Sequence, residues 1–382
     1  MKIAFIPSTF LPIYSGAEIQ SHNIANRLSE KNYKIEVWNS YIPKIKNNKY
    51  NLKKFNNLFV NLIFFCNYYL NLNLKFFLKV YFKFLIKNNF YDVWHFQSLN
   101  FKTLLYLDIL ISLKQKTMVT FHGADIQINK KINYGYRLDS KYDFLLRKVI
   151  KKVDVIQAIS KTIYNDLIKL NVKKSRIVIL PNSIFTPKLK LRKKKNKKFS
   201  LITVARFAEK KKGFDFIKDI SNQLINIIDF QWIFVGRGVS NLKNYDFVIK
   251  NPKYFKLIEE IADNNEFYFP HSKLINLYKN SDLYVHLSRI ESFGVSIIEA
   301  MASGLPILSF KSKGGEELVK NKINGFKIES FNTKNFAKKI IFLAKLKKSF
   351  FNPLKIKNNI KVYDLDRNIK KLTDCYKKLN TL

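Results

Sequence analysis

Short apolar runs alternate with amphipathic stretches along the first half of the chain. The runs predict buried strands, and the stretches between them place apolar residues at the spacing of a helix. Expected strands cover residues 2–7, 34–39, 92–97, 117–121, 154–159 and 177–180, and expected helices cover 17–30, 101–113, 142–152 and 161–170. Strands separated by helices of this length are typical of a parallel, doubly wound sheet.

The same alternation restarts near residue 199 and continues almost to the end of the chain. Expected strands cover 200–205, 232–235, 266–269, 283–287, 306–309 and 325–328. Expected helices cover 214–224, 254–263, 273–280, 294–303, 316–320 and 333–346, and a last helix covers 366–379. The sequence therefore predicts the α/β class, with two Rossmann-like doubly wound domains that face each other across a cleft, the usual place for a small-molecule site.

A dense run of like charges at residues 187–198 separates the two patterns. Such a run will not pack into a core, which favours a solvated linker, with contact to an anionic surface as the alternative. We therefore expect a first domain over 1–185, a basic linker over 186–198, a second domain over 199–363 and a C-terminal helix over 364–382.

The net charge of +41 bears on the possible partners. Nine of the 69 basic residues are arginine, although base recognition and bidentate phosphate contacts favour arginine. No helix-turn-helix, zinc or RNA-recognition signature accompanies the charge. We therefore expect no nucleic-acid partner, and a solvated lysine coat or an anionic membrane surface instead.

Two segments could suggest a membrane protein. The first residues fit a strand better than they fit a secretory signal, which predicts a cytoplasmic protein. The uncharged run between Lys54 and Lys75 is long enough to span a bilayer, but it holds six asparagines. Because amides are costly in hydrocarbon, we expect this run not to span.

The most informative stretch is 289–304, Arg-Ile-Glu-Ser-Phe-Gly-Val-Ser-Ile-Ile-Glu-Ala-Met-Ala-Ser-Gly. It begins as a loop and becomes a helix near Gly294, so Glu291 is held on the loop and Glu299 lies inside the helix. The amides of Gly294 and Val295 then point out of the helix start, where an anion is stabilised. This arrangement suits a nucleotide sugar: one acid can hold ribose hydroxyls, the other the sugar, and the amides the diphosphate.

Three further motifs follow predicted strands. Arg206 ends the strand at 200–205, and Lys212 follows six residues later. Two cations there can clamp a diphosphate, although a basic turn is an equal alternative. Gly16 and Gly236 each follow a strand as well, where a glycine either lets a ligand approach the backbone or simply makes a turn.

Two histidines and two aspartates are candidates of another kind. His122 ends the strand at 117–121, where side chains meet ligands in open α/β sheets, so a functional role is favoured. His95 is embedded in apolar sequence, which favours a structural role. Asp364 and Asp366 stand at the start of the last helix, where aspartates cap N–H groups, so we expect no metal site.

A lysine ridge is predicted in the first domain. Lys75, Lys79, Lys83 and Lys87 recur every four residues, with aromatic and aliphatic residues between them. On a helix this places a lysine stripe beside a broad apolar face, a pattern that fits a helix lying on an anionic membrane. An ordinary core-facing helix with a lysine outer face is the alternative.

Taken together and in this order, the motifs resemble the retaining glycosyltransferases of family 4, which have the GT-B fold. The resemblance runs along nearly the whole chain, and its specific part is the pattern from Ser288 to Pro306. Its weaker parts are Gly16, His122, Pro181-Asn182, Arg206 with Lys212-Gly213, and Val235-Gly236 with Gly238. The chain departs from the family pattern at Ser15, Ser183 and Pro270, where a glycine is common.

The resemblance implies a role for each matching residue. Glu299 would hold the ribose hydroxyls, and Glu291 would contact the transferred sugar or stabilise its developing positive charge. Arg206 and Lys212 would neutralise the leaving diphosphate without a metal or other cofactor. His122 would touch the sugar near the reacting carbon. The remaining donor-binding positions are Gly16, Gly236, Phe293, Gly294 and Val295.

The implied enzyme is a retaining, metal-independent hexosyltransferase that moves a sugar from a nucleotide sugar, with a UDP-sugar favoured, to a glycan hydroxyl. The first domain would bind the acceptor, the second the donor, and the last helix would cross back to the first domain. The lysine ridge suggests a lipid-linked, lipopolysaccharide-type or capsule-type acceptor and a peripheral place on the inner face of the plasma membrane. A nucleotide-sugar epimerase, a phosphorylase on the same fold and a basic nucleic-acid-binding protein are the alternatives.

Overall fold

The computed structural model describes residues 1–186, 198–207, 210–261, 266–346 and 350–381. Its contacts divide the chain into two compact units. The first unit comprises Met1–Asn182, Asn264–Phe269 and Leu365–Leu382, and the second comprises Ser183–Asp263 and Pro270–Asp364. Nearly all of the expected basic linker, 187–197, lies outside the described residues.

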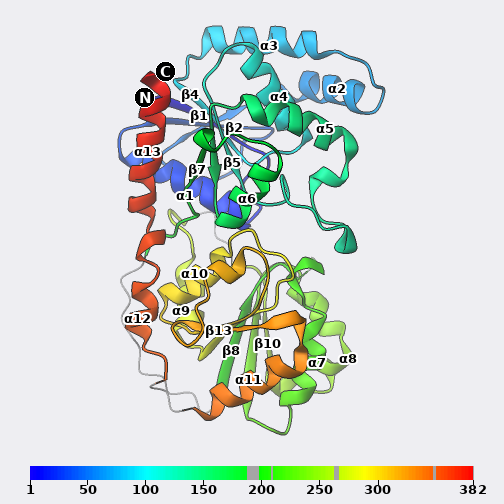
Figure 1. The fold of residues 1–382 in the computed structure, drawn as a ribbon, viewed down its shortest axis with the longest axis vertical. Coiled ribbons are helices and arrows are strands. Elements are labelled where there is room, and N and C mark those ends of the chain that lie inside the picture. The colour runs from blue at the N-terminus through cyan, green and yellow to red at the C-terminus, as the bar shows by residue number, and fades with distance from the viewer. Residues whose placement is uncertain (187–197, 208–209, 262–265, 347–349, 382) are drawn as a thin grey trace. The chain divides into compact units, whose positions relative to one another are not determined.

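The first unit is built on a seven-stranded sheet in the order β3-β2-β1-β4-β5-β6-β7 (Figure 1). Every neighbouring pair of strands is parallel. The strands are β1 (Lys2–Pro7), β2 (Lys34–Asn39), β3 (Asn51–Lys54), β4 (Val93–Gln97), β5 (Thr117–Phe121), β6 (Val155–Ala158) and β7 (Ile177–Ile179). The strand order reverses between β1 and β4, so the sheet is doubly wound and ligands are expected beyond its carboxyl edge.

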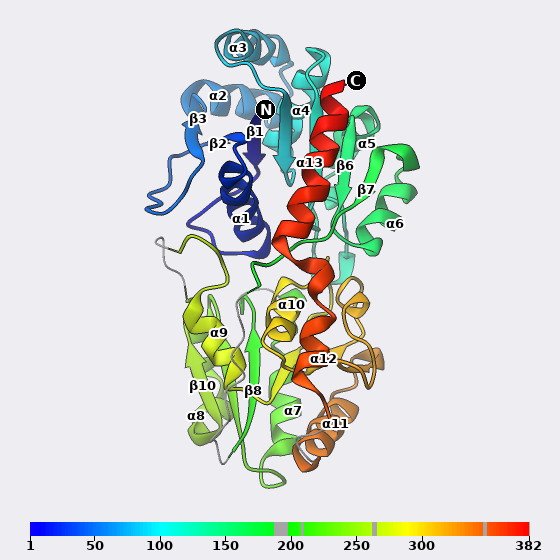
Figure 2. The same cartoon turned by 90° about the vertical axis from the view of Figure 1, so that its left-hand side faces the viewer.

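Seven α-helices of the first unit are described: α1 (Gly16–Glu30), α2 (Asn57–Tyr68), α3 (Lys75–Asn88), α4 (Phe101–Ser112), α5 (Ser140–Val149), α6 (Lys161–Lys169) and α13 (Leu365–Thr381). The helices α1 and α13 lie side by side although they come from opposite ends of the chain (Figures 1 and 2). Arg27 of α1 donates two hydrogen bonds of 2.7 Å each to the carboxylate of Asp366 of α13.

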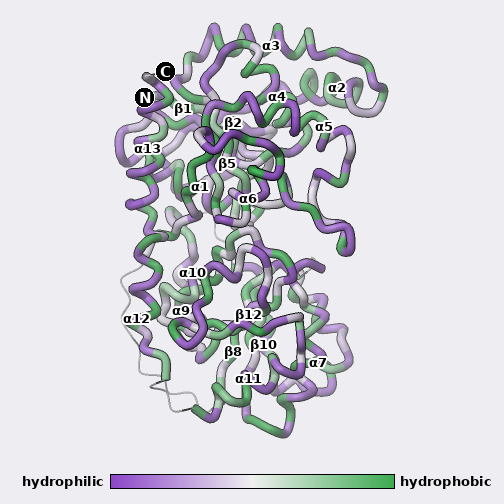
Figure 3. The backbone as a smooth tube through the Cα atoms, in the orientation of Figure 1, coloured by the Kyte–Doolittle hydropathy of each residue, from purple (hydrophilic) through white to green (hydrophobic). Residues whose placement is uncertain are grey.

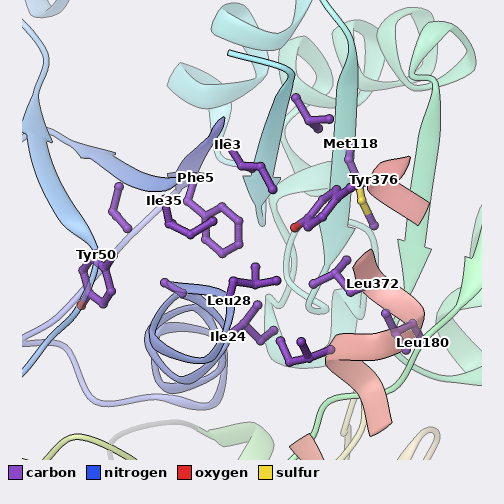
Figure 4. Packing of buried hydrophobic residues seen from close by; sticks show 14 of the residues in the cluster. Ile3, Phe5, Ile24, Leu28, Ile35, Tyr50, Met118, Leu180, Leu372 and Tyr376 are labelled. Atoms are coloured by element: carbon purple, nitrogen blue, oxygen red, sulfur yellow. The ribbon is translucent and has the colours of Figure 1, made fainter. Parts of the chain in front are cut away.

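One apolar core joins these two helices to the sheet. Leu28 of α1 and Leu372 and Tyr376 of α13 belong to the same buried cluster as Ile3 and Phe5 of β1 (Figure 4). All five side chains are at most 1% exposed. Burial of such side chains contributes roughly 1.5–3 kcal/mol each, so the C-terminal helix is a structural part of the first unit.

The second unit contains a six-stranded sheet in the order β10-β9-β8-β11-β12-β13. Its strands, again parallel throughout, are β8 (Phe199–Val204), β9 (Phe230–Val235), β10 (Phe255–Ile258), β11 (Leu283–His286), β12 (Ile307–Phe310) and β13 (Gly325–Ile328). The described α-helices are α7 (Phe216–Leu224), α8 (Asp246–Ile249), α9 (Ser272–Lys279), α10 (Val295–Ala302), α11 (Thr333–Lys345) and α12 (Pro353–Asn358). The predicted class, α/β with two doubly wound parallel sheets, is confirmed.

Some predicted elements are wrong. The helix expected at 254–263 is replaced by β10, which pairs with β9 at the sheet edge. The strand expected at 266–269 does not form: these residues belong to the first unit, where Asn23 and Asn26 of α1 bind the carbonyls of Phe269 and Phe267. The helix expected at 316–320 is a short 3-10 helix, η8 (Gly315–Glu317). The edge strand β3 was not predicted.

Candidate functional site

The candidate catalytic residues of the second unit lie in the loops that follow β8 and β11. Arg206 lies two residues beyond β8, and Lys212 ends a short 3-10 helix, η5 (Lys210–Lys212). Glu291 lies in the loop between β11 and α10. β8 and β11 are neighbours in the sheet. The carboxyl ends of neighbouring parallel strands meet at one edge of the sheet, which brings these loops together.

Lys212 and Glu291 form an ion pair at this edge. The ammonium nitrogen of Lys212 lies 2.8 Å from Oε2 of Glu291, and each side chain is 16% exposed. Burial alone would raise the pKa of Glu291, but the positive charge of Lys212, with smaller contributions from His286 and Lys211, lowers it to about 2. Glu291 is therefore a fixed negative charge at neutral pH.

The loop that carries Glu291 is fixed on both sides. The amide of Arg289 donates to the carbonyl of Lys211 at 2.7 Å, and its guanidinium forms a fork with Asp215, with contacts of 2.6 and 2.5 Å. The same guanidinium lies 4.0 Å above the ring of Phe216. The amide of Glu291 donates to the carbonyl of Lys313 at 3.1 Å. Bidentate and stacked arginine contacts of this kind fix geometry as well as charge.

His286, the last residue of β11, is a neighbour of Glu291 that the sequence analysis did not select. Its side chain is 5% exposed, and Nε2 lies 3.7 Å from Oε2 of Glu291. Burial lowers the pKa of His286 to about 4, and the opposing effects of Glu291 and Lys212 are smaller. The signal that could have found it is the one used for His122, a histidine at the carboxyl end of a strand.

The start of α10 requires its glycine. Gly294 is the N-cap, with φ of 94°, a conformation that residues with a Cβ rarely adopt. A Cβ there would also lie 2.9 Å from Cδ1 of Ile297. The side chain of Phe293 is buried and packs on Tyr363 with ring centroids 5.4 Å apart. Phe293 and Gly294 therefore offer a ligand mainly their backbone. The first amides of α10 lack acceptors four residues back in the helix, although that of Ile297 donates to the carbonyl of Gly294 at 3.0 Å.

Glu299 lies in the middle of α10 and has a different environment from Glu291. It is 7% exposed, and the hydroxyl of Tyr278 donates to its Oε2 at 3.0 Å. Burial raises the pKa of Glu299 to about 7, and the hydrogen bond from Tyr278 opposes the shift only in part. Tyr278 was not predicted, because its distance from Glu299 depends on how α9 packs against α10.

Arg206 and Gly236 occupy the ends of neighbouring strands. The charges of Arg237 and Arg206 act on Glu260, whose pKa is nevertheless raised because burial dominates. Gly236 has φ of 137°, and a Cβ there would lie 2.0 Å from the carbonyl oxygen of Ala205. Gly236 is thus required by the close approach of the backbone after β8 and β9, whatever it does for a ligand.

The first unit holds the other candidates, His122 and Gly16. His122 follows β5, and its Nε2 is buried with no hydrogen-bond partner among the described residues. Burial lowers the pKa of His122 to about 4, so the ring is neutral at pH 7. Gly16 is the first residue of α1, after the N-cap Ser15. An unpaired polar atom in such a buried position is unusual and is typical of a functional residue.

His95 and the two aspartates have structural partners. Nδ1 of His95 lies 2.6 Å from the hydroxyl of Tyr376, and its Nε2 lies 2.8 Å from Oγ1 of Thr120, as expected of a packed histidine. Asp366 pairs with Arg27 as described above, and Asp364 accepts a hydrogen bond from Thr186 at 2.7 Å.

The helices α2 and α3 form an exposed apolar surface, which we call the α2–α3 surface. Eleven of the 25 exposed large hydrophobic side chains among the described residues fall within 58–90. Seven of them recur at helical spacing, as one stripe along α2 and a second along α3 beside the lysines. Figure 3 shows hydrophobic and hydrophilic residues alternating along α3. The residues of the stripes are Leu58, Leu62, Phe65, Tyr69, Phe76, Val80 and Phe84. Neighbouring exposed apolar side chains of this kind are typical of interaction surfaces.

A pocket of about 530 Å³ lies on this surface, with Leu58 of α2 and Phe84 of α3 both in its wall. Of the predicted lysine ridge, Lys83 and Lys87 are exposed, whereas Lys75 contacts Asp108 at 3.2 Å. Within the described residues, every helix is too short or too polar to cross a bilayer.

Comparison with known proteins assigns the chain to a family. A model of Glycosyltransferase Family 4 matches residues 14–186, and a model of Glycosyl transferases group 1 matches residues 187–361. An uncharacterized glycosyltransferase of Methanocaldococcus jannaschii is 26% identical over 370 residues, which cover 90% of this chain and 89% of the relative. An uncharacterized glycosyltransferase of Haemophilus influenzae is 30% identical over 191 residues, 49% of this chain and 50% of that relative.

The fold has close structural counterparts. The structure of the Anabaena protein HepE in complex with UDP-glucose matches with a TM-score of 0.74 and 15% identity, over 99% of this chain and 100% of that one. The chain therefore belongs to the family 4 glycosyltransferases and has the two-domain GT-B fold. This confirms the family resemblance of the sequence motifs.

Proposed function

We propose that the protein transfers a hexose from a nucleoside diphosphate sugar to a hydroxyl of a glycan acceptor, with retention of the anomeric configuration. The observation that carries the proposal is the buried pair of Lys212 and Glu291 at the carboxyl edge of the second sheet. It places a cation and a permanently ionised carboxylate side by side, close in sequence to a helix start that can accept phosphate.

Glycosyl transfer needs both charges. As the bond between the anomeric carbon and the diphosphate breaks, negative charge develops on the diphosphate and positive charge on the sugar ring. Lys212, with Arg206, stabilises the leaving diphosphate in place of a metal ion, and Glu291 stabilises the ring. The acceptor oxygen bonds to the same face of the carbon, and its proton passes to the departing phosphate oxygen. This route needs no covalent glutamate and no cofactor.

The remaining residues bind the donor. Glu299 holds the ribose hydroxyls, and its raised pKa of about 7 lets it either accept or donate a hydrogen bond near neutral pH. The amides of Phe293, Gly294 and Val295 bind sugar and phosphate. In the first unit, the neutral His122 provides a hydrogen bond to the sugar, and Gly16 lets the backbone approach the phosphates. A UDP-sugar is favoured, and the UDP-glucose complex of the similarly folded HepE supports this choice.

The acceptor is a lipid-linked glycan, of the lipopolysaccharide or capsule type, at the cytoplasmic face of the plasma membrane. The support is the α2–α3 surface, where exposed apolar side chains adjoin the exposed Lys83 and Lys87. Apolar residues can enter the interface of a bilayer while the lysines attract anionic headgroups.

The test is a transfer assay with UDP-, GDP- and ADP-sugars and a lipid-linked acceptor extract. We expect nucleoside diphosphate release that depends on the acceptor, and a product whose anomeric configuration matches the donor by NMR. Epimerised donor formed without acceptor, or release of sugar 1-phosphate, would instead identify an epimerase or a phosphorylase. The Glu291→Gln variant is the inactive control.

A further inference from the structure

Lys212 is required twice in the proposed reaction. It neutralises Glu291 in the structure, through the 2.8 Å contact with Oε2, and it is also the cation for the diphosphate. When it turns to the diphosphate, Glu291 loses its main partner while remaining largely buried. An unpaired carboxylate at such a site is strongly destabilised or takes up a proton, and a protonated Glu291 could not stabilise a positive ring.

His286 is placed to solve this problem. The same oxygen, Oε2 of Glu291, that contacts Lys212 lies 3.7 Å from Nε2 of His286. That nitrogen is buried, with no hydrogen-bond partner among the described residues. A shift of the carboxylate by somewhat less than 1 Å would bring the two atoms to hydrogen-bond distance.

Among the described residues, the charged groups that act on His286 are Glu291 and Lys212. A Cβ on Gly315 would lie 3.2 Å from Oγ of Ser312, 3.5 Å from Cβ of Glu291 and 3.6 Å from Nε2 of His286, so this glycine lies beside both members of the pair. The ring of Tyr284 stacks on the imidazole with centroids 6.1 Å apart. Nε2 of His286 is buried, and Glu291 is the carboxylate that the structure places near it, at 3.7 Å.

We propose that His286 is a positioning residue for Glu291, which holds the carboxylate whenever Lys212 turns to an anionic ligand. The proposal rests on the proposed function only for the identity of that ligand. Its electrostatic basis lies within the second unit: Glu291 favours a proton on His286, and Lys212 opposes it. Removing the charge of Lys212 should therefore raise the pKa of His286 and strengthen its interaction with Glu291. Lys211, the other cation that acts on Glu291, stays in place.

The test needs no substrate. The full chain is labelled at histidine Cε1 with carbon-13, and the five histidines are titrated by NMR, with the His286 signal assigned from its loss in His286→Gln. We expect the His286 pKa to rise by one unit or more in Lys212→Met, a tenfold or larger gain in proton affinity. It should stay at the wild-type value in Lys212→Arg, which keeps the cation.

A double variant separates positioning from a general structural effect. In Lys212→Met/Glu291→Gln the His286 pKa should fall back to the wild-type value, because the carboxylate is gone. Should Lys212→Met not fold, Lys212→Gln serves the same purpose. An unshifted His286 in the folded Lys212 variant, or a shift that survives the Glu291 substitution, overturns the proposal. Failure of the proposed function would appear separately, as lack of nucleotide-sugar binding by the wild type.

Discussion

The two glutamates of one motif, Glu291 and Glu299, lie in opposite electrostatic environments. Both are largely buried, but Lys212 contacts Glu291, whereas a tyrosine hydroxyl is the hydrogen-bond partner of Glu299. The pKa of Glu291 is about 2 and that of Glu299 about 7. Burial raises both pKa values, and only at Glu291 does a neighbouring cation, Lys212, reverse the effect. The motif thus combines a fixed charge with a group that titrates near neutral pH.

The largest effect on activity should come from removing Lys212, the cation that distinguishes the surroundings of Glu291 from those of Glu299. In Lys212→Ala, transfer should fall by roughly 10³-fold or more, because the leaving diphosphate and Glu291 both lose their charge partner. Steady-state rates at saturating donor would measure it, with Lys212→Arg retaining part of the activity. Turnover within a few-fold of wild type in Lys212→Ala would remove the ion pair from the mechanism.

The lowered pKa of Glu291 can be tested through the pH dependence of the free energy of unfolding. Its lowered pKa contributes stability that is present above about pH 4.5 and is lost as the pH falls through about 2. Glu291→Gln should therefore be less stable than wild type at pH 7, by up to roughly 3 kcal/mol, and this difference should shrink toward pH 2. Chemical denaturation at a series of pH values measures it. A difference independent of pH would contradict the fixed charge.

Substitution of Glu299 should change stability with pH in the opposite direction. Because its pKa is raised, its favourable contribution is complete below about pH 4.5 and is lost as the pH rises through about 7. Glu299→Gln should match wild type at pH 4.5 and be more stable at pH 8, by up to roughly 3 kcal/mol, since it avoids a buried charge. Thermal denaturation at both pH values is sufficient, and a variant less stable than wild type at pH 8 would refute the assignment.

A smaller effect is expected far from the motif, on the α2–α3 surface. Lys83→Gln/Lys87→Gln should reduce partitioning onto vesicles with 30% phosphatidylglycerol by roughly 10- to 30-fold at low salt. The matched control is Lys334→Gln/Lys338→Gln, which removes two exposed lysines at the same spacing on α11. Equal loss in both variants would indicate binding by total charge alone.

The sequence predicts the two sheets well because buried parallel strands appear as continuous apolar runs. It fails where tertiary pairing decides. Residues 255–258 carry a helical pattern, yet they pair with β9 at the sheet edge. Residues 266–269 form no strand, and Asn23 and Asn26 bind two of their carbonyls instead. Local propensity is a weak guide at such positions.

The candidate site shows the same division. Glu291, Lys212 and the helix start after Gly294 were predicted from motifs, because each occupies a recognisable place relative to a strand or helix. The contacts of Glu291 with His286 and of Glu299 with Tyr278 could not be predicted, since they depend on how β11, α9 and α10 pack. The opposite pKa shifts have other main causes: the cation Lys212 lowers the pKa of Glu291, and burial raises that of Glu299, against the hydrogen bond from Tyr278.

The central claim is that Lys212, paired with Glu291, belongs to a nucleotide-sugar site. The most direct measurement is calorimetric titration of the wild type and Lys212→Ala with UDP-, GDP- and ADP-sugars. We predict that one nucleotide class binds the wild type and binds Lys212→Ala at least tenfold more weakly, since the variant lacks a cation for the diphosphate. Equal affinity in the two proteins, or no binding of any nucleotide sugar to the wild type, would contradict the account.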